Sequence, residues 1–234
     1  MAQALAAAGL DAIYSYAGRT ENPLPQPLPQ RMGGFGGIPG LVNYLQAEAI
    51  THVIYATHPF AAGMSGNAVA ACAATGVPLI ALERPPWAPG AGDRWTMLPD
   101  LAAGIAALPA TPSRIFLAIG RQSLADFAAR PEHHYLLRLV DPPGQPLPLP
   151  QAEAVISRGP FTFEDDRNLL QSHQIQLIVA KNSGGTGARA KLDAARDLGL
   201  PVLMIDRPAI PPRRSVGTVK DVMDWLAHAA LRGV

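Results

Sequence analysis

The stretch LIVAKNSGGTGARAKLDAARDLGLPVLMID, residues 177–206, decides the fold class of this chain. Its two apolar runs, LIVAK (177–181) and VLMID (202–206), are continuously hydrophobic at their centres, as in strands that are buried on both faces. Residues 188–198 between them predict a helix, so the stretch is a strand–helix–strand unit. Such units form parallel sheets that are covered by helices.

The same alternation of short apolar runs and helical stretches extends over most of the 234 residues. The segment PATP (109–112) interrupts it and has the composition of a linker. We therefore expect an α/β protein of two Rossmann-like lobes with parallel sheets and a cleft between them. Residues 1–110 would form a dinucleotide-binding-like lobe that opens with a helix instead of its usual first strand, and residues 113–234 a C-terminal α/β lobe. The pair His133-His134 is expected in a solvated turn.

Composition excludes several classes of protein. Apolar residues make up 48% and charged residues 16% of the chain, which is typical of a globular protein and not of a disordered one. The net charge of +1 gives no global attraction to nucleic acid or to an anionic membrane. No apolar run is long enough to span a bilayer, and the single cysteine, Cys72, excludes an internal disulfide and a cysteine metal cage. We expect a cytoplasmic monomer without a bound metal.

Ligands of parallel α/β sheets bind beyond the carboxyl ends of the strands, so the residues that follow each strand are the candidates for a site. Arg19 follows a predicted strand at 12–16, where an arginine accommodates the 2′-phosphate of NADP in dinucleotide folds; a solvated loop arginine is the alternative. The motif RMGGFGG (31–37) precedes a helix, and amides at a helix start bind anions. We expect its glycines to contact a cofactor, with a flexible turn as the alternative: Gly33, Gly34, Gly36 and Gly37.

The turn Thr57-His58 follows the predicted strand at 52–56 and comes directly before a helix. A histidine at this place can hydrogen-bond a cofactor or donate a proton to a substrate. A lone histidine is otherwise most often structural, so its position at a strand end is what makes His58 a catalytic candidate.

The second lobe has a larger set of cations, amides and glycines after its strands. The motif KNSGG (181–185) has the composition of an anion-binding loop at a helix start, and a plain helix cap is its alternative. Together these residues indicate a site for a polyanionic small molecule, without naming a reaction. The candidates are Arg121, Arg158, Lys181, Asn182, Ser183, Gly184 and Gly185.

Eight motifs in one order resemble the precorrin-6A reductase family of cobalamin (vitamin B12) biosynthesis. They are RMGGFGG (31–37), ATHPFAAGMSGNAVAAC (56–72), LERPPW (82–87), IGRQ (119–122), VDPP (140–143), RGPF (158–161), KNSGG (181–185) and IDRP (205–208). The resemblance implies an NADPH-dependent reduction of one carbon–carbon double bond of precorrin-6A, a polycarboxylate tetrapyrrole, giving precorrin-6B. It places the cofactor at Arg19, the four glycines and Thr57, and the substrate carboxylates or cofactor phosphates at the second set, with His58 or water as proton donor.

Three alternatives stay open. The substrate could be the cobalt-containing precorrin-6A of the anaerobic branch, or another planar polycarboxylate. The chain could also be a non-catalytic α/β binding protein for a polyanionic small molecule. Family members usually begin with a strand and a G-G-T-x-E-A turn that this sequence does not show, so weaker cofactor binding is expected. Tyr55 stands where the family more often has aspartate, so no role of that aspartate is carried over.

Overall fold

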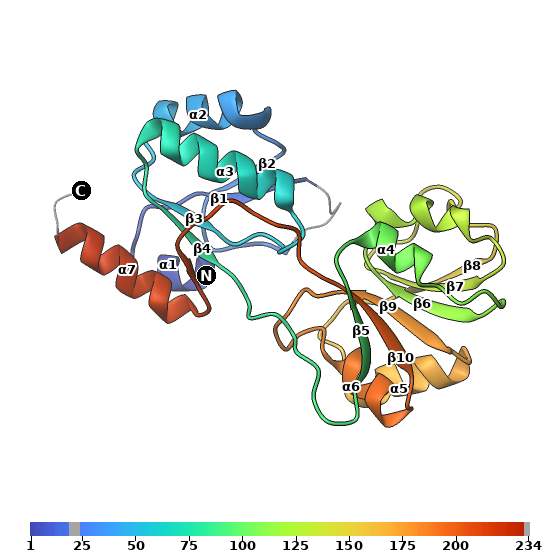
Figure 1. Ribbon diagram of the computed structural model, residues 1–234. Helices are drawn as coiled ribbons and strands as arrows, with labels where there is room; N and C mark the ends of the chain where they lie inside the picture. The colour runs from blue at the N-terminus through green and yellow to red at the C-terminus, as the bar shows by residue number, and fades with distance from the viewer. Residues whose placement is uncertain (19–23, 232–234) are drawn as a thin grey trace. The chain divides into compact units, whose positions relative to one another are not determined.

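The computed structural model describes residues 1–18 and 24–231 of the chain (Figure 1). The chain forms two compact units. Unit 1 combines Met1–Arg84 with Ala209–Val234, and unit 2 is the continuous segment Pro85–Pro208. The chain therefore passes from unit 1 into unit 2 and then returns to unit 1.

Unit 2 is built on a six-stranded, all-parallel sheet with the strand order β5-β10-β9-β6-β7-β8. The strands are β5 (Arg94–Leu98), β6 (Arg114–Ala118), β7 (His134–Leu139), β8 (Ala152–Ile156), β9 (Leu177–Lys181) and β10 (Pro201–Ile205). Figure 1 shows helices on both faces of this sheet. One face carries α5 (Phe163–Ser172) and α6 (Ala190–Asp197), and the other carries α4 (Leu101–Ala106) with the 3-10 helices η1 (Arg121–Ser123) and η2 (Ala125–Ala129).

The central strands of this sheet form the core of unit 2. Ile178, Val179 and Ala180 of β9 are completely buried, although alternate side chains of a strand point to opposite faces. Both faces of β9 are therefore covered, as the apolar run 177–181 predicts. Removing a large apolar side chain from water contributes about 1.5–3 kcal/mol, so these strands supply much of the stability of unit 2.

Unit 1 contains two small parallel sheets. One pairs β1 with β2, and the other has the order β11-β4-β3. Helices α2 and α3 pack side by side on one face, while α1 and α7 cover the other (Figure 1). The elements are α1 (Ala2–Ala7), β1 (Tyr14–Tyr16), β2 (Gln30–Met32), α2 (Gly37–Ala47), β3 (Val53–Tyr55), α3 (Ala62–Thr75), β4 (Leu79–Leu82), β11 (Ser215–Val216) and α7 (Val219–Leu231).

The two units are divided differently from the predicted lobes at 1–110 and 113–234. Residues 85–110 belong to unit 2, because β5 pairs with β10 and α4 packs against β10. The end of the chain belongs to unit 1, because β11 pairs with β4.

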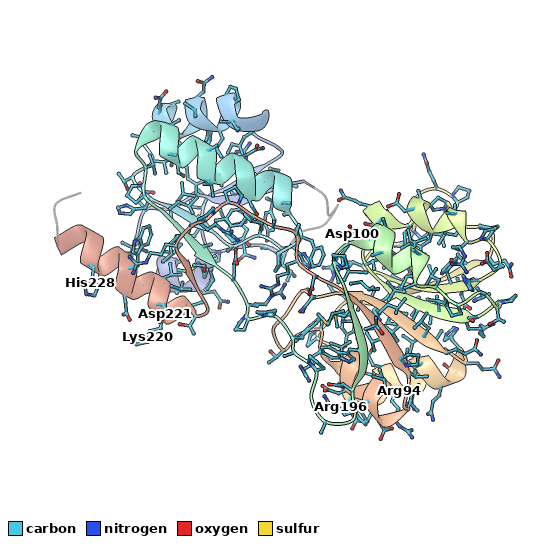
Figure 2. The ribbon with its side chains drawn as sticks, in the orientation of Figure 1. Arg94, Asp100, Arg196, Lys220, Asp221 and His228 are labelled. Carbon is cyan, nitrogen blue, oxygen red and sulfur yellow. The ribbon has the colours of Figure 1, made fainter. Side chains whose placement is uncertain are left out.

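Two arginines hold β5 in the sheet of unit 2, and both are labelled in Figure 2. Arg196 of α6 forms an ion pair of 2.9 Å with Asp93, directly before β5. Arg94 in β5 donates a hydrogen bond of 2.7 Å to the carbonyl oxygen of Gly199. Burial alone would raise the pKa of Asp93, but hydrogen bonds from Arg196 and from the Gly90 amide lower it, so the carboxylate stays charged inside this contact.

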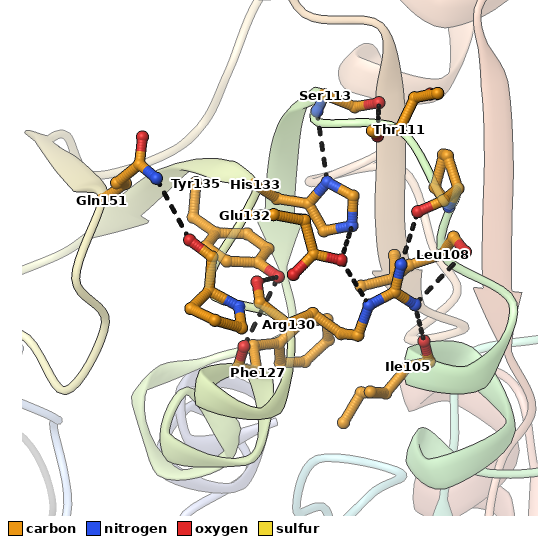
Figure 3. A network of polar contacts seen from close by, with 12 residues as sticks. Ile105, Leu108, Thr111, Ser113, Phe127, Arg130, Glu132, His133, Tyr135 and Gln151 are labelled. Carbon is orange, nitrogen blue, oxygen red and sulfur yellow. Dashed lines mark hydrogen bonds and ion pairs between the residues drawn. The ribbon is translucent and has the colours of Figure 1, made fainter.

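The segment 109–112 is not a linker between units, because Arg130 holds it within unit 2 (Figure 3). The Arg130 guanidinium donates to the carbonyl oxygens of Ile105 and Leu108, both at 3.3 Å, and to that of Pro109. A cation at these carbonyls complements the negative end of the α4 dipole and ties the residues that follow α4 to unit 2.

His133 is also placed differently from the prediction of a solvated turn. Its side chain is completely buried, and its Nδ1 accepts a hydrogen bond of 3.2 Å from the Ser113 amide (Figure 3). Burial lowers the pKa of His133, so the ring is held in its neutral form. The histidine therefore has a structural partner at the beginning of β6.

Candidate functional site

The glycine turn of unit 1 lies between the carboxyl end of β2 and the beginning of α2. Gly33, Gly36 and Gly37 have φ angles of 106°, 82° and 78°, which residues other than glycine rarely adopt. Gly36 is the N-cap of α2, so the first amides of the helix lie at the turn without helical partners. These features fit the expected contact with an anionic ligand.

Thr57 and His58 lie in the loop that connects β3 to α3, and both are exposed. The Phe60 amide donates a hydrogen bond of 3.2 Å to Nδ1 of His58. Since Nδ1 is the acceptor, a neutral His58 ring carries its proton on Nε2. The loop therefore holds an exposed histidine whose neutral form has its N–H at Nε2.

The predicted arginines of unit 2 meet at the carboxyl ends of three neighbouring strands. Arg121 follows β6, Asp141 follows β7 and Arg158 follows β8. Nη2 of Arg121 donates to the Asp141 carbonyl oxygen at 2.9 Å, and Nη2 of Arg158 lies 3.6 Å from the Asp141 carboxylate. The sheet thus brings together two cations that are 37 positions apart in the sequence.

Lys181 extends this group of cations at the end of the next strand, β9. Its Nζ donates a hydrogen bond of 2.9 Å to Oγ of Ser123, in the 3-10 helix that begins at Arg121. Partial burial lowers the pKa of Lys181, and the charge of Asp126 opposes this effect. The ends of β9, β6, β7 and β8 therefore form one edge with several cations.

Asn182 is part of the same loop but has a structural partner. Its side-chain oxygen accepts a hydrogen bond of 2.8 Å from the Trp87 amide, and its side-chain nitrogen donates one of 3.0 Å to the Trp87 carbonyl oxygen. Nε1 of Trp87 also donates to the carbonyl oxygen of Gly185 at 2.6 Å. The loop 181–185 is therefore held in place by the Trp87 backbone and side chain.

Gly184 and Ser183 complete this loop. Gly184 has a φ of 68°, and a Cβ atom there would lie 2.1 Å from the carbonyl oxygen of Pro85. Arg207, after β10, donates from Nε to the Asn182 carbonyl oxygen at 3.0 Å and from Nη2 to that of Ser183 at 3.3 Å. Glycine is required at 184 because the backbone of another segment passes so close.

Arg19 lies outside the described residues. Within residues 1–18 and 24–231 no group of three or more histidine, cysteine, aspartate or glutamate side chains could hold a metal ion. No helix in this part of the chain is long and apolar enough to cross a membrane.

The sequence did not identify three residues that take part in the candidate sites of the two units: Arg31 in unit 1, and Trp87 and Asp141 in unit 2. Arg31 lies in β2, two residues before Gly33, and contacts two carbonyl groups of the glycine turn. Trp87 and Asp141 stand after strands, within motifs that the sequence singles out, but their partners are far away in the chain. Only their place in the segments that follow β4 and β7 could have indicated Trp87 and Asp141.

The family model described as "Precorrin-6x reductase CbiJ/CobK" matches residues 1–227. A precorrin-6A reductase from Rhodobacter capsulatus is 64% identical, and the alignment covers 100% of this chain and 94% of that protein. A precorrin-6A reductase from Sinorhizobium sp is 47% identical over 93% of this chain and 84% of that protein. A solved structure, "CobK precorrin-6A reductase", superimposes with a TM-score of 0.94 at 64% identity, covering 97% of this chain and 90% of that one.

The parallel α/β fold, the cations at its strand ends and these matches define an α/β reductase. The chain belongs to the precorrin-6x reductase CbiJ/CobK family. The family expected from the eight motifs and the α/β class with parallel sheets are both confirmed.

Proposed function

We propose that this chain catalyses the NADPH-dependent reduction of one carbon–carbon double bond of precorrin-6A, giving precorrin-6B, in cobalamin biosynthesis. The observation that carries the proposal is the 64% identity, over the whole chain, to a precorrin-6A reductase. Metal-free precorrin-6A is favoured over the cobalt form because both relatives named above are precorrin-6A reductases. Family membership supports the reduction of precorrin-6A. We propose in addition that NADPH is the reductant and that the residues named below have the roles given there.

The glycine turn fits a dinucleotide. No atom of the described residues lies within 4 Å of the place where a Cβ atom would be at Gly33, Gly34 or Gly36, so these residues leave the backbone there open to a ligand. The positive end of the α2 dipole favours an anionic group at this turn. We assign these glycines, together with Gly37 and Thr57, to NADPH, and Arg19 to its 2′-phosphate. When bound, NADPH supplies the hydride.

The strand ends of unit 2 fit a polycarboxylate. Arg121, Arg158 and Lys181 offer cations to the acetate and propionate groups of the tetrapyrrole, and guanidinium groups match carboxylates in geometry. The loop 182–185 is assigned to the same ligand, chiefly through its backbone, because the Asn182 side chain is engaged by Trp87. These contacts would hold the reacting carbon in the orientation that hydride transfer needs.

The reduction adds one hydride and one proton, and His58 is the proposed proton donor. Its Nδ1 accepts the Phe60 amide hydrogen, so Nε2 is the protonated nitrogen of the neutral ring and is the atom from which we expect the proton to be donated. A water molecule is the alternative donor.

Anaerobic mixing of the purified protein with precorrin-6A and NADPH tests the function. NADPH absorbance should fall, and the tetrapyrrole should gain the mass of two hydrogens. NADH and cobalt-precorrin-6A in parallel reactions test the choice of cofactor and substrate. NADPH loss without a reduced tetrapyrrole would contradict the proposal.

A histidine variant tests the proton donor. His58→Gln should lower kcat and leave both KM values unchanged, whereas His228→Gln, an exposed histidine on α7, is the control. An unchanged kcat in His58→Gln would assign the proton to water.

The proposal also includes a cytoplasmic monomer that has no nucleic-acid or membrane partner. Light scattering of the purified chain during size-exclusion chromatography should give the mass of one chain, 24.6 kDa. A doubled mass would contradict the monomer without affecting the reaction.

A further inference from the structure

Arg31 in β2 contacts two backbone carbonyl groups of the glycine turn. Nη1 donates to the carbonyl oxygen of Gly33 and Nη2 donates to that of Gly34, both at 3.1 Å. Nη1 also donates to Oγ of Ser15, the residue that pairs with Arg31 in β1, at 2.8 Å. One guanidinium group thus fixes two consecutive peptide groups relative to the strands.

Two aromatic rings keep this guanidinium in position. Its central carbon lies 3.9 Å from the centre of the Phe35 ring and 5.1 Å from that of Tyr44 in α2. The two rings also contact each other edge to face, with centroids 5.1 Å apart. Arg31 therefore connects β1, the glycine turn and α2, and the stacking restricts its own rotation.

The carbonyl contacts determine where the amides of the turn point. In a trans peptide group the C=O and N–H bonds point in opposite directions. Because the carbonyls of Gly33 and Gly34 face Arg31, the N–H groups of Gly34 and Phe35 face away from it. Within the described part of the chain neither N–H has a hydrogen-bond acceptor. No described residue lies within 4 Å of a Cβ atom built at Gly33 or Gly34, so the described part of the chain leaves this turn open to a ligand.

We propose that Arg31 is a positioning residue of the NADPH site, which orients the Gly34 and Phe35 amides toward a phosphate group of the dinucleotide. This inference rests on the proposed function, since it concerns the same cofactor. Successive amides that point to one side attract an anion, and the cation behind them strengthens the positive potential. Arg31 itself does not need to touch the ligand.

The test is steady-state kinetics of Arg31→Met and Arg31→Lys with precorrin-6A. Met keeps much of the stem that packs in this region but loses the donors, and Lys keeps the charge but loses the fork that reaches two carbonyls. We expect the KM for NADPH to rise about tenfold or more in Arg31→Met, which corresponds to about 1.4 kcal/mol. The kcat at saturating NADPH and the KM for precorrin-6A should stay within about twofold of the wild type.

Arg130→Met is the matched control, because Arg130 also donates to backbone carbonyls but belongs to unit 2, whereas the glycine turn belongs to unit 1. It should lower the melting temperature and leave the KM for NADPH unchanged. A KM for NADPH in folded Arg31→Met equal to that of the wild type would overturn the inference. If Arg31→Met does not fold, the Arg31→Lys result decides in the same way.

A comparison of NADH with NADPH shows which phosphate group the amides bind. An equal loss of affinity for NADH and NADPH assigns the diphosphate, and a loss confined to NADPH assigns the 2′-phosphate. A binding titration monitored by NADPH fluorescence distinguishes the proposed function from the proposed role of Arg31. A wild type that binds NADPH but does not reduce precorrin-6A contradicts the function, while equal binding by the wild type and Arg31→Met contradicts only the role of Arg31.

Discussion

The side-chain amide of Asn182 pairs with both backbone polar groups of Trp87, accepting from its N–H at 2.8 Å and donating to its C=O at 3.0 Å. The two residues are 95 positions apart, and both are buried. The contact joins the segment that enters unit 2 to the loop that follows β9. It therefore couples the stability of unit 2 to the shape of the proposed substrate loop.

Asn182→Ala should leave the N–H and C=O of Trp87 buried without partners. Unsatisfied buried groups cost about 1–3 kcal/mol each, so we expect a loss of about 2–4 kcal/mol in the free energy of unfolding. Urea denaturation measures this loss. Asn168→Ala, an exposed asparagine in α5, should change the free energy of unfolding by less than about 0.5 kcal/mol. Equal effects of the two substitutions would show that the Trp87 contact contributes no stability.

Gly184→Ala should be strongly destabilising. The new Cβ would lie 2.1 Å from the Pro85 carbonyl oxygen, and the φ of 68° is unfavourable for alanine. We expect a loss of roughly 3 kcal/mol, by clash and backbone strain together. Gly187→Ala, where nothing lies within 4 Å of the added atom, is the control and should be nearly neutral. Thermal unfolding of the two variants tests whether Pro85 approaches the loop as closely as described.

Lys191 predicts a pH dependence of stability. Its side chain is buried over the Trp87 ring, 4.9 Å from the ring centre, and burial lowers the pKa of Lys191 to about 8, which Asp166 opposes and Arg138 reinforces. In the unfolded chain the pKa is about 10.4. Between these values the unfolded state binds more protons, so the free energy of unfolding should rise as the pH rises.

In Lys191→Met the free energy of unfolding should no longer show the increase that comes from Lys191. This increase amounts to roughly 3 kcal/mol between about pH 8 and pH 10. Lys220→Met is the control, because Lys220 is exposed on α7 and its contact with Asp224 raises the pKa of Lys220 above the window. Urea denaturation at several pH values measures the difference. A slope in Lys191→Met equal to that of the wild type would show that Lys191 has an ordinary pKa.

Arg121→Ala and Arg158→Ala should weaken the binding of precorrin-6A. Each removes one cation from the edge around Asp141, and a charge-assisted hydrogen bond contributes about 1.5–3 kcal/mol. We expect the KM for precorrin-6A to rise roughly tenfold in each variant while the KM for NADPH stays unchanged. Arg167→Ala, whose partner is Asp197 at 2.6 Å, is an arginine control outside this edge. If the KM for NADPH rises instead, these arginines bind the cofactor phosphates.

The site residues at the strand ends could be predicted from the sequence because of the geometry of a parallel sheet. Arg121, Arg158 and Lys181 each come after an apolar run, and parallel strands present such residues at one edge. The engagement of Asn182 could not be foreseen, since its partner is a backbone segment 95 positions earlier. The same holds for Arg31, whose role depends on the direction of two peptide groups.

The fold was predictable where burial is continuous. The run 177–181 is a strand as expected, and all of its residues but Lys181 are buried. Strand β5 was missed because it lies at the edge of the sheet, where Arg94, Thr96 and Met97 are exposed and the sequence shows no continuous apolar run. The division into units was missed for a related reason. It depends on the pairing of β5 with β10 and of β11 with β4, and local patterns do not encode such pairings.

The path of the chain through its units has a consequence for truncated chains. Unit 2 is one continuous segment, residues 85–208, so all six of its strands precede β11 and α7 in the chain. A chain that ends at residue 208 would leave Ile80 of β4 without Val222 and Trp225, with which it shares a buried cluster. Such a chain would keep every strand of unit 2 but would expose the β4 face of unit 1 to chaperones and proteases.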